Sequence, residues 1–131
     1  MLVRIVAAVI GLALGSAPLS ARAQSPACAT SAKRVGECFA VHGRMMSCTS
    51  APSVRIWIVG TRRVLGVADA EGDVAGDDVL AGRLKWEMLA LPPCAKAAWG
   101  DFSVCPLTPD RPGVMRRVCL AEAKKLTIRE R

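Results

Sequence analysis

The chain of 131 residues is long enough for one domain, and its 18 lysines and arginines against 11 aspartates and glutamates give a formal net charge of +7. A single histidine, six cysteines without a Cys-x-x-Cys pair, and no Gly-x-Ser-x-Gly, His-Glu-x-x-His or phosphate-binding loop motif disfavour zinc sites, redox motifs and the common hydrolases. The positive charge is spread along the chain, which suits loose association with acidic polymers but identifies no partner.

Residues 1–23 have the pattern of a secretory signal peptide. Arg4 supplies the positive start, Ile5–Leu14 is an apolar run, and Ala21-Arg22-Ala23 is a small-x-small cleavage site. The apolar run is about half the length of a membrane-spanning helix, which favours cleavage over a retained anchor. Cleavage after Ala23 leaves 108 residues, with 16 basic and 11 acidic side chains. We therefore expect a periplasmic or secreted protein with no membrane span after cleavage.

The cysteines all follow this segment, and an even number of them in a small exported chain predicts a disulfide framework. They are Cys28, Cys38, Cys48, Cys94, Cys105 and Cys119. The segment 24–36 is rich in small polar residues and predicts a flexible N-terminal lead, which Cys28 could attach to the rest. Residues 37–131 are expected to form a single small domain.

The first predicted strand covers residues 38–48, where side chains alternate between two faces. One face carries Phe39, Val41, Gly43 and Met45, and the other carries Cys38, Ala40, His42, Arg44 and Met46.

Residues 53–67 predict a β-hairpin around Gly60 and Thr61. Gly60 suits the first central position of a type II′ turn, which requires a positive φ. This turn places Trp57 opposite Val64 and Ile56 opposite Leu65. One face of the hairpin is then apolar and is expected in the core: Val54, Ile56, Ile58, Leu65 and Val67. The other face combines arginine with an aromatic ring: Arg55, Trp57, Val59, Arg62, Val64 and Gly66.

An acidic segment and a helix are expected next. Leu80, Leu84, Met88 and Leu91 recur at helical spacing from Asp78 onward, Val79 and Trp86 flank that stripe, and Pro92-Pro93 ends it. The preceding acidic residues, Asp69, Glu71, Asp73, Asp77 and Asp78, could suggest calcium. The segment departs from an EF-hand, because Val74 stands where the turn glycine belongs and Leu80 where the glutamate belongs. We therefore favour a solvated loop that caps the helix, and expect no metal site.

Three more strands are predicted at 101–106, 114–120 and 126–130, with a turn over 121–125 before the last. A hairpin symmetric about Pro112 places Cys105 opposite Cys119 and Val104 opposite Leu120. We therefore expect a Cys105–Cys119 disulfide.

The predicted order is three strands, one helix and two or three strands. It favours a mainly β fold, a small five- to six-stranded OB-like barrel (βββαββ), in which the helix lies between the third and fourth strands. An SH3-like barrel or a small open sandwich would give similar strand patterns.

Four stretches resemble a family of small uncharacterised bacterial exported proteins. They are VHGR (41–44), RIWIVGTRRVLGV (55–67), GDFSVCPLTPDRPG (100–113) and VCLAEAKKL (118–126). The resemblance covers most of the chain after residue 23. It implies export and a single domain. The family has no assigned activity, so the resemblance implies no catalytic residue.

The candidate binding residues lie on the arginine-aromatic face: Arg55, Trp57 and Arg62, with His42 and Arg44 from the first strand. Such a face could bind oligosaccharides or polyanions by stacking and charge, although the alternative is that Trp57 is merely packed and the arginines solvated. No nucleic acid is expected, because one aromatic residue is a poor stacking platform and an exported protein rarely meets single strands.

The sequence predicts no enzyme and no cofactor. His42 is the only histidine and no activated hydroxyl or thiol is evident beside it. We expect a monomeric domain with a binding or structural role, whose partner is a protein or polymer of the cell envelope. The alternatives are a polyanion- or oligosaccharide-binding module using the Arg55/Trp57 face, and a small secreted hydrolase or enzyme inhibitor.

Overall fold

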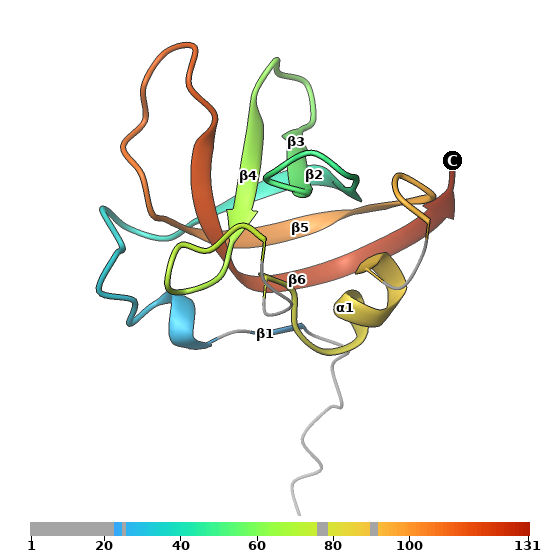
Figure 1. Ribbon diagram of the computed structural model, residues 1–131, viewed down its shortest axis with the longest axis horizontal. Helices are drawn as coiled ribbons and strands as arrows, with labels where there is room; N and C mark the ends of the chain where they lie inside the picture. The colour runs from blue at the N-terminus through green and yellow to red at the C-terminus, as the bar shows by residue number, and fades with distance from the viewer. Residues whose placement is uncertain (1–22, 25, 76–78, 90–91) are drawn as a thin grey trace, which may run out of the picture.

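The computed structural model describes residues 23–24, 26–75, 79–89 and 92–131, and it has a mainly β fold with one helix (Figure 1). The predicted signal peptide, apart from Ala23, lies outside the described residues. Five strands form a sheet that closes in a ring: β2 (Phe39–Ser47), β3 (Val54–Ile58), β4 (Val64–Ala68), β5 (Lys96–Pro106) and β6 (Arg116–Glu130). The mainly β architecture predicted from the sequence is therefore confirmed.

The order around the ring is β2, β3, β4, β6 and β5, after which β5 pairs with β2 again. Neighbouring strands are antiparallel except β4 and β6, which are parallel. A short strand β1 (Ala23–Gln24) adds to β6 beside Ala123 and Glu122. In Figure 1 the β3–β4 connection and the β5–β6 connection project from the same side of the molecule.

The hairpin register is as predicted: Ile56 pairs with Leu65 and Trp57 pairs with Val64. The turn itself differs by one position. The Thr61 N–H donates to the Ile58 carbonyl, so Val59 and Gly60 are the central residues, and Gly60 has φ 82°. The prediction of Gly60 and Thr61 as central residues was wrong because a four-residue loop gives the same register as the two-residue turn.

The core lies inside the ring and contains the apolar faces of all five strands. Met45, Val54, Ile56, Leu65, Val67, Phe102, Val104 and Val118 are each at most 1% exposed. Gly43 on β2 is required by this packing, because a Cβ at that position would lie 2.5 Å from the Ile56 Cγ2 atom. Strand alternation therefore directs one face of the predicted strand 38–48 into the core, together with the hairpin face that was expected there.

One helix, α1 (Gly82–Leu89), covers part of this core with Leu84 and Met88, which are buried. The helix is shorter than predicted at its start. Gly82 has φ 59°, a left-handed conformation that a right-handed helix cannot continue through. Asp77, Asp78 and Leu91, which the prediction used, lie outside the described residues. Trp86 is 72% exposed.

The last strand corrects the prediction of a turn over 121–125. β6 runs without a break from Arg116 to Glu130, with two shifts in its register to β5. Trp99 and Asp101 face Thr127 and Lys124, so β6 has one extra residue there, and Lys125 adopts φ 54°. Such bulges bend a strand without ending it.

Three disulfides are present: Cys28–Cys119, Cys38–Cys105 and Cys48–Cys94. The predicted register is confirmed, since Cys105 faces Cys119 and Val104 faces Leu120. The predicted Cys105–Cys119 disulfide is wrong, because each of these cysteines bonds to one from the N-terminal side that reaches the same part of the sheet. The three bonds are compatible with an extracellular or exported protein.

The lead predicted over 24–36 is attached to the sheet. Cys28 is buried in a small cluster with Ala68, Cys105, Leu107 and Cys119. The Val35 N–H donates to the Pro106 carbonyl, 2.9 Å away. Among the described residues, no helix is both long and apolar enough to cross a membrane.

Candidate functional site

Arg44 lies on the outer face of the sheet, between two tryptophans. It is the cross-strand neighbour of Trp57 on β3 and of Trp99 on β5. Its guanidinium carbon is 5.2 Å from the Trp57 ring centre and 5.6 Å from the Trp99 ring centre. The two rings meet edge to face, with centres 6.1 Å apart. Cation–π attraction therefore places a positive charge between two half-buried aromatic rings.

Hydrogen bonding fixes part of this arrangement. The Trp57 Nε1–H donates to the Thr61 carbonyl at 2.7 Å, which orients the ring toward the β3–β4 turn. The Arg44 Nε atom is buried and has no hydrogen-bond partner among the described residues. Since buried polar groups are usually paired, the site has an unused donor.

A cavity of about 290 Å³ opens beside this cluster, and we call it the first cavity. It is lined by Arg44, Met46, Cys48, Ser50, Ser53, Arg55, Trp57 and Val64. Arg55 is held by its neighbours on the 48–53 connection: Nε donates to the Pro52 carbonyl at 2.9 Å, and Nη2 donates to Ser50 Oγ at 3.2 Å. The first cavity thus combines two arginines, an aromatic ring and two hydroxyl groups.

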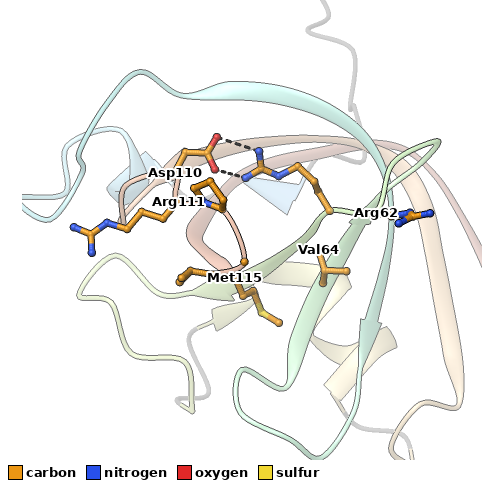
Figure 2. Close-up of a pocket in the computed structure, with 9 residues that line it drawn as sticks. Arg62, Val64, Asp110, Arg111 and Met115 are labelled. Carbon is orange, nitrogen blue, oxygen red and sulfur yellow. Dashed lines mark hydrogen bonds and ion pairs between the residues drawn. The ribbon is translucent and has the colours of Figure 1, made fainter.

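A larger cavity of about 690 Å³, the second cavity, lies between the β3–β4 turn and the β5–β6 connection (Figure 2). It is lined by Arg62, Arg63, Val64, Asp110, Arg111, Pro112, Gly113, Val114 and Met115. Arg63 and Asp110 form a two-pronged ion pair across it. The hydrogen bond from Arg63 lowers the pKa of the Asp110 carboxyl, and the same bond raises the pKa of Arg63.

The other two arginines of the second cavity stand at its ends. Figure 2 shows the Arg62 and Arg111 side chains extending to opposite sides, with Val64 and Met115 between them. Both are exposed, and neither side chain forms a hydrogen bond or ion pair within the described part of the chain. Their charges are therefore available to an anionic ligand.

The predicted site residues are only partly brought together. Arg44, Arg55 and Trp57 line the first cavity, whereas Arg62 lines the second. His42 lines neither, and its Nδ1 atom is 3.0 Å from an oxygen of Asp101 on β5. Sequence reasoning missed Trp99, because the strand was expected to start at Asp101. It also missed Arg111, whose only sequence signal is its place in a Pro-rich loop.

The acidic loop satisfies its own backbone. The Asp69 carboxylate accepts the N–H groups of Glu71 and Asp73, each at 2.9 Å, and Asp73 accepts that of Ala75. Within the described ranges, no three His, Cys, Asp or Glu side chains gather closely enough to hold a metal ion. This is the geometry of a loop whose own backbone N–H groups engage the Asp69 and Asp73 carboxylates.

Comparison of the chain with protein-family models, curated proteins and solved structures found no match.

Proposed function

We propose that the ring of strands is an OB-like barrel. The support is the strand order, in which the first strand of the ring pairs with the second and the fourth, and the third runs parallel to the fifth. The helix α1 also falls between the third and fourth of these strands. Folds of this class bind oligosaccharides or oligonucleotides on the outer face of their second and third strands. In this chain those strands are β3 and β4.

We propose further that the protein is exported and acts as a non-enzymatic binding module for acidic oligosaccharides. The observation that carries this proposal is the first cavity, where Arg44 and Arg55 stand beside the Trp57 ring. A sugar ring can stack on the aromatic face, while arginine binds a carboxylate with two parallel hydrogen bonds. Ser50 and Ser53 add hydroxyl groups suited to the hydroxyls of a sugar.

The shape of the site favours a saccharide over a nucleic acid. Proteins that bind single strands stack successive bases on successive aromatic platforms. In the two cavities Trp57 is the one aromatic lining residue. Trp99 contacts Trp57 and Arg44 from β5 and lines neither cavity. A single aromatic ring with arginines spaced around it suits an acidic polysaccharide, because the apolar faces of the sugars can stack on the ring while their carboxylates reach the arginines.

A matched pair of tryptophan variants tests the proposal. We expect Trp57→Ala to weaken binding of trigalacturonate about tenfold, because the stacking surface is lost; a base stacked on an aromatic side chain contributes about 1–3 kcal/mol, and we take this as the scale. Trp86→Ala is the control, since Trp86 is 72% exposed on α1 and lines neither cavity. Isothermal titration calorimetry of both variants gives the comparison. Equal affinity of Trp57→Ala and the unmodified protein would show that the first cavity is not the site.

The dependence of affinity on salt provides a second test. Arginine–carboxylate contacts at a partly exposed site are screened by ions, so the affinity for trigalacturonate should fall as the salt concentration rises. Affinity that does not change with salt would exclude charge as the basis of recognition. Export is tested separately, by sequencing the N-terminus of the protein recovered outside the cytoplasm, which should start at Gln24.

A further inference from the structure

The two cavities share one lining residue, Val64, so they adjoin at this position of β4. We call the surface that leads from one cavity across Val64 to the other the passage. Beside Val64 the chain needs a glycine: a Cβ on Gly66 would lie 2.6 Å from the Pro52 ring and 3.1 Å from the Met115 sulfur. Pro52 and Met115 therefore both lie close over Gly66, two residues along the chain from Val64.

Positive charge is distributed along this whole passage. Arg44 and Arg55 lie in the first cavity, and Arg62 and Arg111 lie at the two ends of the second. Asp110 is the one acidic residue in the two linings. It pairs with Arg63, so it does not neutralise the charges of the other arginines in the cavities. The electrostatic preference for an anion therefore extends beyond the site proposed above.

The floor between the charges is apolar. Val64, Pro112, Val114 and Met115 line the second cavity, and Val114 is 59% exposed. A ligand of closely spaced charges, such as polyphosphate, would have to cover this surface with anionic groups. A chain of sugar rings covers it with C–H faces and presents its carboxylates to the arginines at the rim.

We infer that the ligand is a linear acidic polysaccharide that crosses Val64 and occupies both cavities, with Arg62 and Arg111 binding carboxylates of the sugars in the second cavity. This inference rests on the proposed function, because it extends the ligand of the first cavity. The second cavity then acts as an additional subsite. Joining two subsites through one ligand raises the overall affinity by tenfold or more, without any new kind of contact.

The test compares two ligand lengths and two double variants. Trigalacturonate is short enough for one cavity, and octagalacturonate is long enough for both. Arg62→Ser/Arg111→Ser removes the charges of the second cavity. Arg83→Ser/Arg129→Ser removes equal charge at exposed positions on α1 and β6 that line neither cavity. All four combinations are titrated by calorimetry alongside the unmodified protein.

We expect the unmodified protein to bind octagalacturonate at least about tenfold more tightly than trigalacturonate. In Arg62→Ser/Arg111→Ser this advantage should disappear while trigalacturonate affinity stays within about twofold. The Arg83→Ser/Arg129→Ser control should keep the full advantage. Two results would show that the inference is wrong while leaving the proposed function intact. In one, Arg62→Ser/Arg111→Ser still binds octagalacturonate more tightly than trigalacturonate. In the other, the unmodified protein binds both ligands with equal affinity.

Two other results separate this inference from the proposal beneath it. If neither ligand binds the unmodified protein, the proposed function itself is wrong. If polyphosphate of similar charge binds more tightly than octagalacturonate, and Arg62→Ser/Arg111→Ser weakens that binding, the passage recognises anions but the polysaccharide class is wrong.

Discussion

The two faces of the β3–β4 hairpin have opposite properties, although they come from the same short segment. On the inner face Val54, Ile56, Leu65 and Val67 are at most 1% exposed. On the outer face Arg55, Trp57 and Val64 are half-buried and line a cavity. Strand alternation thus separates the residues that hold the ring together from those available to a ligand. Substitutions on the inner face should change stability, and those on the outer face should change binding.

The largest effect on stability is expected for Leu65→Ala. This substitution removes a buried side chain from the core and should lower the free energy of unfolding by about 2–5 kcal/mol. Arg62→Gln, on the outer face and exposed, should change it by less than about 0.5 kcal/mol. Urea denaturation of the oxidised protein measures both. Similar losses in the two variants would contradict the division between the faces.

Replacing a glycine by alanine on each face of the sheet should give a smaller difference in stability between the two faces. In Gly43→Ala the new Cβ meets Ile56 at 2.5 Å and the Trp57 carbonyl at 3.0 Å, so we expect a loss of about 1–3 kcal/mol. In Gly66→Ala it meets the Pro52 ring at 2.6 Å, in the connection between β2 and β3 rather than in the core, and the flexible Met115 side chain at 3.1 Å. Thermal unfolding should show a smaller loss for Gly66→Ala than for Gly43→Ala. Octagalacturonate titration should show that Gly66→Ala, by displacing Pro52 and Met115 beside the passage, has the greater effect on binding.

Arg44 tests whether the outer face contributes to stability at all. Arg44→Met keeps the length of the side chain and removes both cation–π contacts, which are worth about 0.5–1 kcal/mol each at partly exposed sites. The new apolar contacts with Trp57 and Trp99 should offset much of this loss. We expect a net change of less than about 1 kcal/mol, measured by denaturation. Trigalacturonate binding should nevertheless fall about tenfold, and an unchanged affinity would remove Arg44 from the site.

The smallest change in stability is expected when the Arg63–Asp110 ion pair is removed. The hydrogen bond from Arg63 lowers the pKa of Asp110 in the folded state, so Arg63→Gln should raise that pKa toward the ordinary value of about 3.9. A lowered folded-state pKa means that the pair stabilises the fold above the ordinary aspartate pKa. That contribution is lost as the pH falls through the lowered value. Because the pair is exposed, salt screens it and the effect on unfolding is slight. NMR titration of the Asp110 carboxyl in both proteins checks the direction.

The pairing of strands that are joined by a short connection could be predicted from the sequence. The pairing of Trp57 with Val64 follows from alternation on either side of a short loop, and so does the pairing of Cys105 with Cys119. The closure of the ring could not be predicted in this way. β2 pairs with β5, so that Arg44 faces Trp99, 55 positions further along the chain. Local alternation does not state which distant strands meet, and Trp99 was therefore missed.

The disulfide pairing could not be predicted for the same reason. Cys105 has Cys119 as its neighbour on β6, while Cys38 precedes Phe39 on β2, which pairs with Val104 on β5. Cys105 thus has a possible partner on each side, and register alone does not choose between them. The bulge at Lys125 is a further case, because a single inserted residue interrupts the apolar alternation in the same way that a turn does.

The place of β6 in the ring affects when the fold can be completed. β6 is the last element in chain order, yet it pairs with β1, β4 and β5, and its pairing with β4 joins Leu65 to Arg116. Contacts between such distant segments form late and slowly. A nascent chain that still lacks β6 leaves β4 and β5 without this partner, so the ring stays open. Under the export proposed above, this order of assembly would keep the chain open enough to pass through a secretion channel until its last strand has been made.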